Sequence, residues 1–241
     1  MARPLSRIAV WMLLIALVAT TGCKNEAAPP PPTNVLLLTM DTTRASALGC
    51  YGAPDMATPV LDGLAREGVL YERAFSTSQG TNPSHASIHT GLYGSRHRVI
   101  NNRTLLDPAA VTLAEVFASQ GYATLAAVSV RHIDSDNTRF DQGFDTFLHC
   151  EQSEMRAGVR NELELEERLG QLARGDRPFF AWVHYYDPHG AYRPPEPFND
   201  MFEPGDRYEE VPVQDTMDVD DFFKAAGTVD PDVQIALYKG E

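Results

Sequence analysis

The residues most able to do chemistry lie in the segment Ser76–Arg98, where Thr81 stands directly before Asn82-Pro83. Asparagine before proline predicts a helix start, because the amide caps the first turn and proline is tolerated at the first helical position. Thr81 is therefore expected at a helix mouth, with His85 one turn further on. Unpaired N–H groups and the helix dipole attract anions there and favour a developing alkoxide. A threonine before a helix is nevertheless more often a cap or loop residue than a nucleophile.

A carboxylate follows the apolar run Asn34–Met40, which predicts a short strand buried on both faces of a parallel sheet. Asp41 falls at the carboxyl end of this strand. Open α/β sheets place their ligand sites at that edge. A carboxylate and a hydroxyl presented at one sheet edge are the parts of a metal-assisted nucleophilic site.

The remaining pattern alternates strands with amphipathic helices. The other predicted strands are Ala123–Val130 and Phe179–His184; the predicted helices are Ser84–Thr90 ended by Gly91, one after Thr58-Pro59, one around Leu113–Phe117 closed by Gly121, Glu154–Arg174, and one begun by Asp230-Pro231. Buried strands joined by such helices predict an α/β fold, with helices on both faces of a mostly parallel sheet. His184, at a strand end, is interpreted as a hydrogen-bonded core residue.

The first residues predict an export signal. Arg3 and Arg7 precede the apolar run Ile8–Ala19, which is too short to span a bilayer comfortably. Gly22-Cys23 resembles a bacterial lipobox, in which Cys23 is lipidated and anchors the chain to a membrane; an ordinary cleaved signal peptide is the alternative. Both readings predict an exported protein, periplasmic or on the outer membrane or cell surface. Residues 24–33 form a Pro-rich linker, and 34–241 are the predicted catalytic domain.

Net charge and cysteine count restrict the classes of binding partner and the possible disulfide pairing. The chain has 241 residues and a formal charge of −13, and removing residues 1–22 takes away two arginines and no acid, leaving −15. So acidic a surface argues against a nucleic-acid partner. Apart from Cys23, the cysteines are Cys50 and Cys150, which are able to pair in an oxidising compartment; two unpaired thiols are the favoured reading.

Two stretches, NVLLLTMDTTRASALGCYG and TNPSHASIHTGLYGSRH, resemble the sulfatase branch of the alkaline phosphatase superfamily, metal-dependent hydrolases of sulfate and phosphate esters. The resemblance continues through residues 112–115, 121–124, 142–145 and 178–189. It implies a three-layer α/β/α fold. It also implies that Asp41 binds a divalent cation (calcium, zinc or manganese), that Thr81 is the nucleophile, and that His189 of the Pro188-His189 element contacts sulfate or phosphate oxygens.

Two departures from the family motif bear on the chemistry. Thr81 stands where formylglycine sulfatases carry cysteine or serine, and His85, the second predicted catalytic residue, stands where they carry arginine. Formylglycine is therefore not expected. A covalent ester on Thr81 would have to be cleaved by a second displacement at its sulfur or phosphorus atom. The resemblance leaves sulfate and phosphate esters both open, with a small molecule, glycan or lipid as the esterified group. His132 lies near the place of the family's GKWH histidine but is displaced from it.

The family's Asp-His-Gly segment, which completes the metal site, has no counterpart in this sequence. The chain is thus expected to be the N-terminal portion of the catalytic domain. The sequence is compatible with two functions: an ester hydrolase, or a catalytically inactive remnant or binding module with the same fold.

Overall fold

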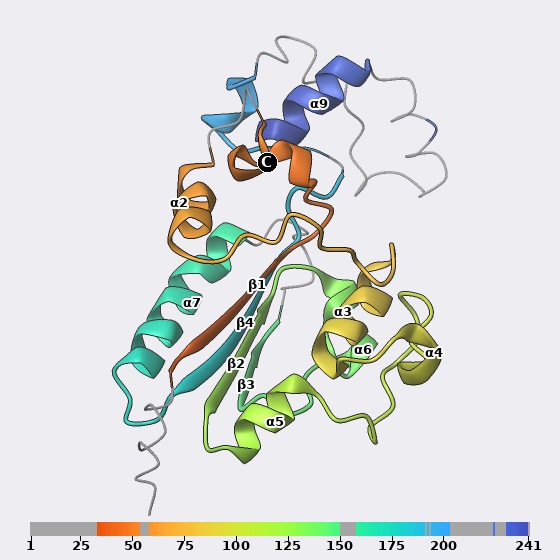
Figure 1. Ribbon diagram of the computed structural model, residues 1–241, viewed down its shortest axis with the longest axis vertical. Coiled ribbons are helices and arrows are strands. Elements are labelled where there is room, and N and C mark those ends of the chain that lie inside the picture. The colour runs from red at the N-terminus through yellow and green to blue at the C-terminus, as the bar shows by residue number, and fades with distance from the viewer. Residues whose placement is uncertain are drawn as a thin grey trace, which may run out of the picture. The chain divides into compact units, whose positions relative to one another are not determined.

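A parallel sheet forms the centre of the computed structural model shown in Figure 1. Its strands are β1 (Val35–Met40), β2 (Ala123–Val128), β3 (Thr146–Leu148) and β4 (Phe179–Tyr185), in the order β1-β4-β2-β3. The structure describes residues 33–53, 58–149, 158–190, 192, 194–202, 224 and 230–240. The predicted leader with Cys23, the linker except Thr33, residues 154–157 and Cys150 lie outside these ranges.

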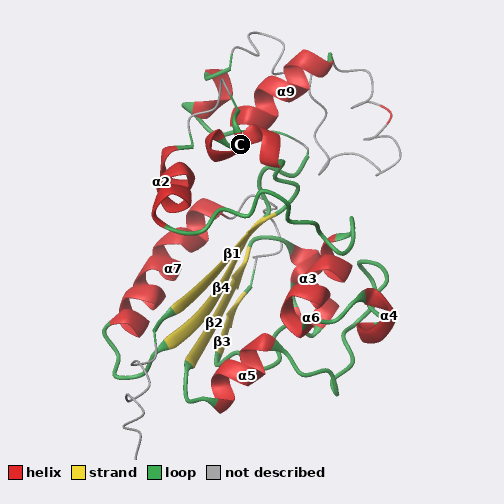
Figure 2. Ribbon diagram, in the orientation of Figure 1, coloured by secondary structure: helices red, strands yellow, loops and turns green. Residues whose placement is uncertain are grey.

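Helices cover both faces of this sheet (Figure 2). The helices are α2 (Pro59–Glu67), α3 (Thr81–Thr90), α4 (Gly94–His97), α5 (Leu113–Ser119), α6 (Ser135–Thr138), α7 (Gly158–Ala173) and α9 (Pro231–Gly240), with 3-10 turns at Ala45–Ala47, Gly49–Tyr51, Arg131–Ile133 and Phe198–Asp200. In Figure 1, α7 lies on one side of the strands, and α3 and α5 lie on the other. The predicted α/β architecture with a parallel sheet is confirmed.

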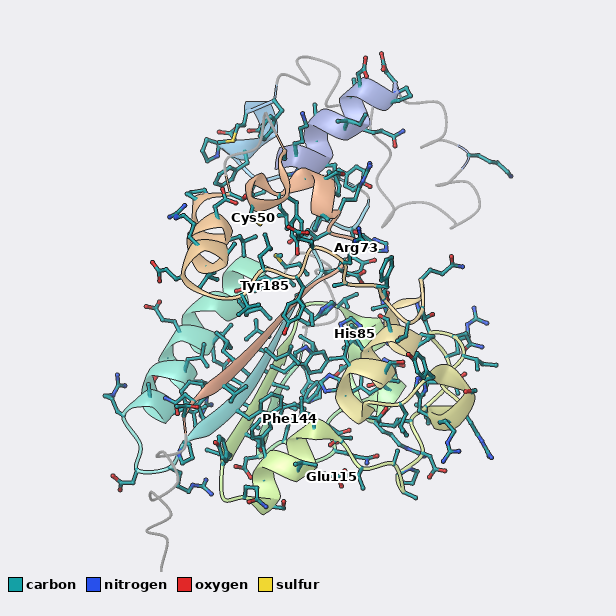
Figure 3. All side chains as sticks on the ribbon, in the orientation of Figure 1. Cys50, Arg73, His85, Glu115, Phe144 and Tyr185 are labelled. Carbon is teal, nitrogen blue, oxygen red and sulfur yellow. The ribbon has the colours of Figure 1, made fainter. Side chains whose placement is uncertain are left out.

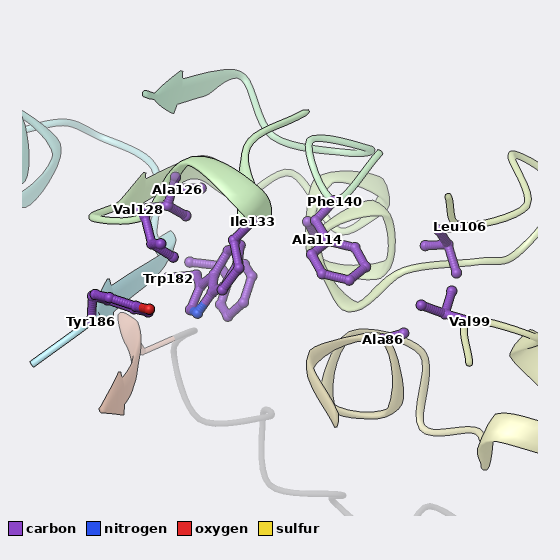
Figure 4. Close-up of a cluster of buried hydrophobic side chains, with 12 residues drawn as sticks. Ala86, Val99, Leu106, Ala114, Ala126, Val128, Ile133, Phe140, Trp182 and Tyr186 are labelled. Carbon is purple, nitrogen blue, oxygen red and sulfur yellow. The ribbon is translucent and has the colours of Figure 1, made fainter. Parts of the chain in front are cut away.

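The two faces of β4 explain the layers. Phe180 and Trp182, both fully buried, point into a core that includes Ala86 of α3 and Ala114 of α5 (Figure 4). The alternate residues of β4 point to the opposite face, where Leu165 of α7 packs against them. Because strand side chains alternate between faces, one apolar strand supplies both cores.

The first strand differs from its prediction in one respect. β1 is in the predicted place, but it lies at the edge of the described sheet and its burial alternates. Leu36 and Leu38 are 48% and 45% exposed, whereas Val35 and Leu37 pack against the core. The prediction of burial on both faces was therefore wrong, because an apolar run does not specify which strand occupies the sheet edge.

Local signals place several helix boundaries. Thr112 and Glu115 form a reciprocal capping box at the start of α5, and Gly91 ends α3 in the left-handed conformation with φ of 66°. Cys50 is a free, partly buried thiol. Within the described ranges, none of the helices has the length and apolar character needed to cross a membrane.

Candidate active site

The structure brings Asp41 and Thr81 together at the carboxyl end of the sheet. The Thr81 hydroxyl donates to Asp41 Oδ2 over 3.1 Å, although 40 residues separate the two in sequence. Asp41 directly follows β1, and its backbone N–H donates to the Tyr185 carbonyl over 2.9 Å, which extends the β1–β4 pairing past the end of the strand. The carboxylate is thus fixed by the sheet, and the hydroxyl by α3.

Thr81 is the first residue of α3, three residues earlier than predicted, and Gly80 is the N-cap. The prediction that Asn82 caps this helix was wrong. Its side-chain amide instead donates to the carbonyls of Asn102 and His132, at 3.2 and 2.9 Å. These two contacts tie the helix start to two separate loops.

The backbone amides at the start of α3 are largely occupied. The Asn82 N–H donates to Asn102 Oδ1 over 3.0 Å, the Ser84 N–H donates to the Gly80 carbonyl, and Pro83 has no N–H. Fewer backbone N–H groups are therefore free at the helix start than the sequence predicted. An anion at this place needs side-chain partners in addition to the helix dipole.

His85, one turn after Thr81, lies between α3 and the sheet (Figure 3). Its Nδ1 is 2.8 Å from the Thr81 carbonyl oxygen, and because a carbonyl only accepts, Nδ1 carries the proton and donates. The ring is 5% exposed, and burial lowers its pKa, opposed by the Thr81 hydrogen bond and the charge of Asp41. His85 is therefore neutral and holds the backbone of Thr81.

His189 and His132 approach the same site from two loops. The His189 ring stacks on Tyr186 with centroids 4.3 Å apart, and its Nδ1 donates to the Gly190 carbonyl over 2.7 Å, which leaves Nε2 for other contacts. The His132 ring meets the same Tyr186 edge-on at 5.8 Å. The pair of imidazoles thus shares one aromatic support.

His132 is the site residue that the sequence-based reasoning set aside. Burial lowers its pKa, Asp41 raises it, and His189 and His85 lower it, so all four groups share one electrostatic environment. Its Nε2 is buried and has no hydrogen-bond partner among the described residues. A signal was available, because His132 follows the carboxyl end of β2 by four residues, the same edge of the sheet as Asp41.

The loop after Asp41 is held in an unusual conformation. Thr42 has φ of 52°, in the left-handed region that β-branched residues rarely adopt. Its hydroxyl donates to the Pro188 carbonyl over 3.1 Å, and its own carbonyl accepts from the Tyr238 hydroxyl of α9 over 3.3 Å. Tyr238 also accepts from the Arg44 N–H at 2.8 Å. Contacts from two distant segments therefore maintain this backbone beside the site.

The described residues do not form a complete metal site. Within them, no group of three or more His, Cys, Asp or Glu side chains is arranged to hold an ion. Asp41 places one carboxylate beside Thr81, and the unpartnered His132 Nε2 is a buried nitrogen in the same environment. Since tight sites for calcium or zinc need at least four ligands, this set is partial.

A family model described as Sulfatase matches residues 33–230. The chain belongs to the sulfatase family. An ulvan-active sulfatase of Formosa agariphila is 28% identical over 228 residues, which are 84% of this chain and 44% of that protein. An N-acetylgalactosamine-6-O-sulfatase of Bacteroides thetaiotaomicron is 32% identical over 122 residues, 46% of this chain and 24% of that protein. The chain thus spans less than half the length of these two relatives.

Solved structures support the fold. The phosphonate monoester hydrolase of Agrobacterium radiobacter matches with a TM-score of 0.63 at 23% identity, over 87% of this chain and 56% of that one. A structure solved with its substrate D-glucosamine-2-N,6-O-disulfate matches with a TM-score of 0.59 at 17% identity, over 86% and 52% of the two chains. At these identities the matches show the alkaline-phosphatase-like α/β fold, and the predicted family resemblance is confirmed.

Proposed function

We propose that this sulfatase-family chain carries the nucleophile of an ester hydrolase, with Thr81 attacking sulfur or phosphorus. The observation that carries the proposal is the 3.1 Å hydrogen bond from the Thr81 hydroxyl to Asp41 at the start of α3. It orients the hydroxyl, gives its proton an acceptor and leaves the oxygen lone pairs for the substrate. In the first step the Thr81 oxygen–central atom bond forms, the ester bond breaks, and the alcohol leaves. Water then displaces Thr81 and releases sulfate or phosphate.

His189 and His132 are the proposed partners of the transferred group. Free amides at the helix start are few, so side chains have to supply much of the hydrogen bonding to the anion's oxygens. Beside Asp41 and Thr81, the ring nitrogens without a hydrogen bond among the described residues are His189 Nε2 and His132 Nε2. Because His189 Nδ1 already donates to the Gly190 carbonyl, His189 Nε2 donates to an anion only when the ring carries both protons. A protonated His189 would also serve to donate a proton to the leaving alcohol.

The family generally uses a divalent cation, and we propose Asp41 as the carboxylate that this part of the chain contributes to it. Carboxylate and hydroxyl oxygens suit calcium and manganese, whereas imidazole nitrogens suit zinc. The further ligands that such a site requires have to come from outside the described ranges, because the partial set found there has one carboxylate. A bound cation would stabilise negative charge on the ester oxygens.

Two ester classes are supported by different observations. The names of relatives, an ulvan-active sulfatase and an N-acetylgalactosamine-6-O-sulfatase, favour a sulfated glycan. The threonine favours phosphate or phosphonate esters. A formylglycine hydrate expels sulfate through its second hydroxyl, which threonine lacks. Water must therefore displace the Thr81 oxygen by attack on the sulfur or phosphorus atom. A phosphonate monoester hydrolase is among the matched folds. We therefore propose a sulfate ester as the first candidate and a phosphate ester as the second.

A paired assay tests the proposal. Turnover of 4-nitrophenyl sulfate, 4-nitrophenyl phosphate and bis(4-nitrophenyl) phosphate is measured with calcium, zinc or manganese for the chain and its Thr81→Ala and Thr81→Ser variants. We expect hydrolysis of one class, loss of at least about 100-fold in kcat for Thr81→Ala, and partial retention for Thr81→Ser. Thr90→Ala is the matched control, because that hydroxyl donates to the Ala86 carbonyl and accepts from the Leu92 N–H, and neither partner belongs to the site. Turnover unchanged in Thr81→Ala would refute the nucleophile, and no turnover on any ester would favour an inactive remnant.

A further inference from the structure

Thr39 is the meeting point of three buried aromatic rings behind the site. Its hydroxyl oxygen lies 3.0 Å from His184 Nδ1, 3.1 Å from Trp182 Nε1 and 3.4 Å from His85 Nε2. Trp182 and His184 are 0% and 1% exposed. The third ring, His85, is the one whose Nδ1 donates to the Thr81 carbonyl. A single hydroxyl on β1 thus connects the sheet to the backbone of the proposed nucleophile.

Counting protons determines how this cluster is bonded. A threonine hydroxyl donates once and accepts twice, and an indole N–H only donates. Trp182 therefore takes one acceptor position of Thr39. Because the Thr81 carbonyl fixes the His85 proton on Nδ1, a neutral His85 has a lone pair at Nε2 that requires the Thr39 proton. His184 must then donate from Nδ1 into the last acceptor position of Thr39.

The alternative arrangement carries one more proton. It needs a charged His85 that donates to Thr39, with Thr39 donating to His184 Nδ1. That places a positive charge among buried rings and leaves a buried N–H at His184 Nε2, which has no partner among the described residues. The first arrangement leaves only an unpaired lone pair at His184 Nε2. Unpaired acceptors are tolerated more readily than unpaired N–H donors, so the neutral arrangement is favoured.

We propose that Thr39 is a positioning residue for Thr81, which selects the Nδ1–H tautomer of His184, holds Nε2 of the His85 ring and so fixes the carbonyl of the proposed nucleophile. The chain of contacts runs from Trp182 and His184 on β4, through Thr39 on β1, to His85 and then Thr81 on α3. It determines how deep α3 sits against the sheet. The idea rests on the proposed function for its effect on turnover, whereas the tautomers are a property of the fold alone.

The test uses Thr39→Val, which keeps the shape and removes the hydroxyl, and Thr39→Ser, which restores it. Thr146→Val is the matched control, because Thr146 lies on β3 of the same sheet and makes no side-chain hydrogen bond that involves these rings. Imidazole nitrogen NMR on the ¹⁵N-histidine-labelled chain reads the tautomers. Melting temperature checks that each variant is folded.

We expect the wild-type chain, Thr39→Ser and Thr146→Val to show single Nδ1–H tautomers for His85 and His184. Thr39→Val should lose the single His184 tautomer and shift the His85 Nε2 resonance. If the chain turns over an ester, kcat of Thr39→Val should fall by roughly 10- to 100-fold with KM within about 2-fold, because misplaced nucleophiles lose rate rather than binding. Thr39→Ser should recover most of kcat.

Unchanged histidine nitrogen spectra in Thr39→Val, or Nε2–H tautomers in the wild type, would overturn the proposal. A fall in kcat that Thr39→Ser does not restore would also count against it. If the wild-type chain hydrolyses no ester, the proposed function fails, and the NMR result still decides whether Thr39 sets the tautomers.

Discussion

His89 gives the sharpest quantitative test of how this core is built. It lies on α3, is 2% exposed, and its ring stands edge-on to Trp182 with centroids 4.2 Å apart. Neither ring nitrogen has a hydrogen-bond partner among the described residues. Burial, with a smaller contribution from His85, lowers its pKa from 6.5 to about 3. A charged imidazole therefore cannot be accommodated at this position without a large loss of stability.

The pH dependence follows from this pKa. Because the folded-state pKa is below the unfolded value, the unfolded chain binds more protons between about pH 6.5 and 3, so the stability is complete above 6.5 and is lost as the pH falls. At 1.36 kcal/mol per pKa unit, the 1.5 units from 6.5 to about pH 5 cost about 2 kcal/mol for His89 alone. His184, with a pKa lowered to about 2 by burial and neighbouring histidines, adds a second contribution of the same sign.

The test is His89→Phe, measured by urea denaturation followed by circular dichroism at about pH 7.5 and about pH 5. At neutral pH the substitution has two opposing effects on stability: it removes unpaired buried polar atoms, which stabilises, and it inserts a larger ring, which destabilises. The informative quantity is therefore how the difference in unfolding free energy between variant and wild type changes with pH. The stability of the variant relative to the wild type should increase by about 2 kcal/mol on going to pH 5. The contribution of His184 largely cancels, because burial, His85 and His132 outweigh His89 in lowering the His184 pKa.

Ile88→Phe is the control, because Ile88 is the preceding residue of α3, is 43% exposed and does not titrate. Its effect on stability should be the same at both pH values. The reasoning is refuted if His89→Phe and the wild type lose stability in parallel as the pH falls, since that would mean the imidazole has partners that accept its charge.

Three further predictions concern the loop after β1, the metal and the leader. Thr42→Asn should raise the free energy of unfolding by about 1 kcal/mol, because asparagine tolerates the left-handed φ of 52° better than a β-branched residue. Urea denaturation measures this change. A destabilised variant would show that the hydrogen bond from Thr42 to the Pro188 carbonyl outweighs the backbone strain. Calorimetric titration of the chain with calcium, zinc or manganese should show binding that Asp41→Asn removes, since Asp41 is the one carboxylate placed beside Thr81 among the described residues; binding that survives Asp41→Asn would contradict this placement. Cys23→Ala expressed in a bacterium should lose incorporation of labelled palmitate and release the chain from the membrane fraction, whereas an equally soluble wild type would favour an ordinary cleaved signal peptide.

The sequence predicted those parts of the fold that local chemistry decides. Phe179–Val183 of β4 is an uninterrupted apolar run, and the structure buries the central residues of the strand on both faces. The end of α3 at Gly91 and the start of α9 after Asp230 were also predicted, because a left-handed glycine and a capping carboxylate act within a few residues of themselves. β1 shows the limit of such signals: its composition resembles that of β4, but its place at the edge depends on how the chain crosses over between strands.

The candidate site was predictable only in part, because long-range contacts determine its details. Asp41 and Thr81 each carried a local signal, and the structure places them in hydrogen-bond contact. Asn82 carried a misleading one: its local preference for capping is overridden by carbonyls 20 and 50 residues away. His85 was predicted to be catalytic, yet its two ring nitrogens face the Thr81 backbone and Thr39. A histidine one turn after the proposed nucleophile can therefore hold the helix start instead of exchanging protons with the substrate, and the histidine tautomers around Thr39 test which role it has.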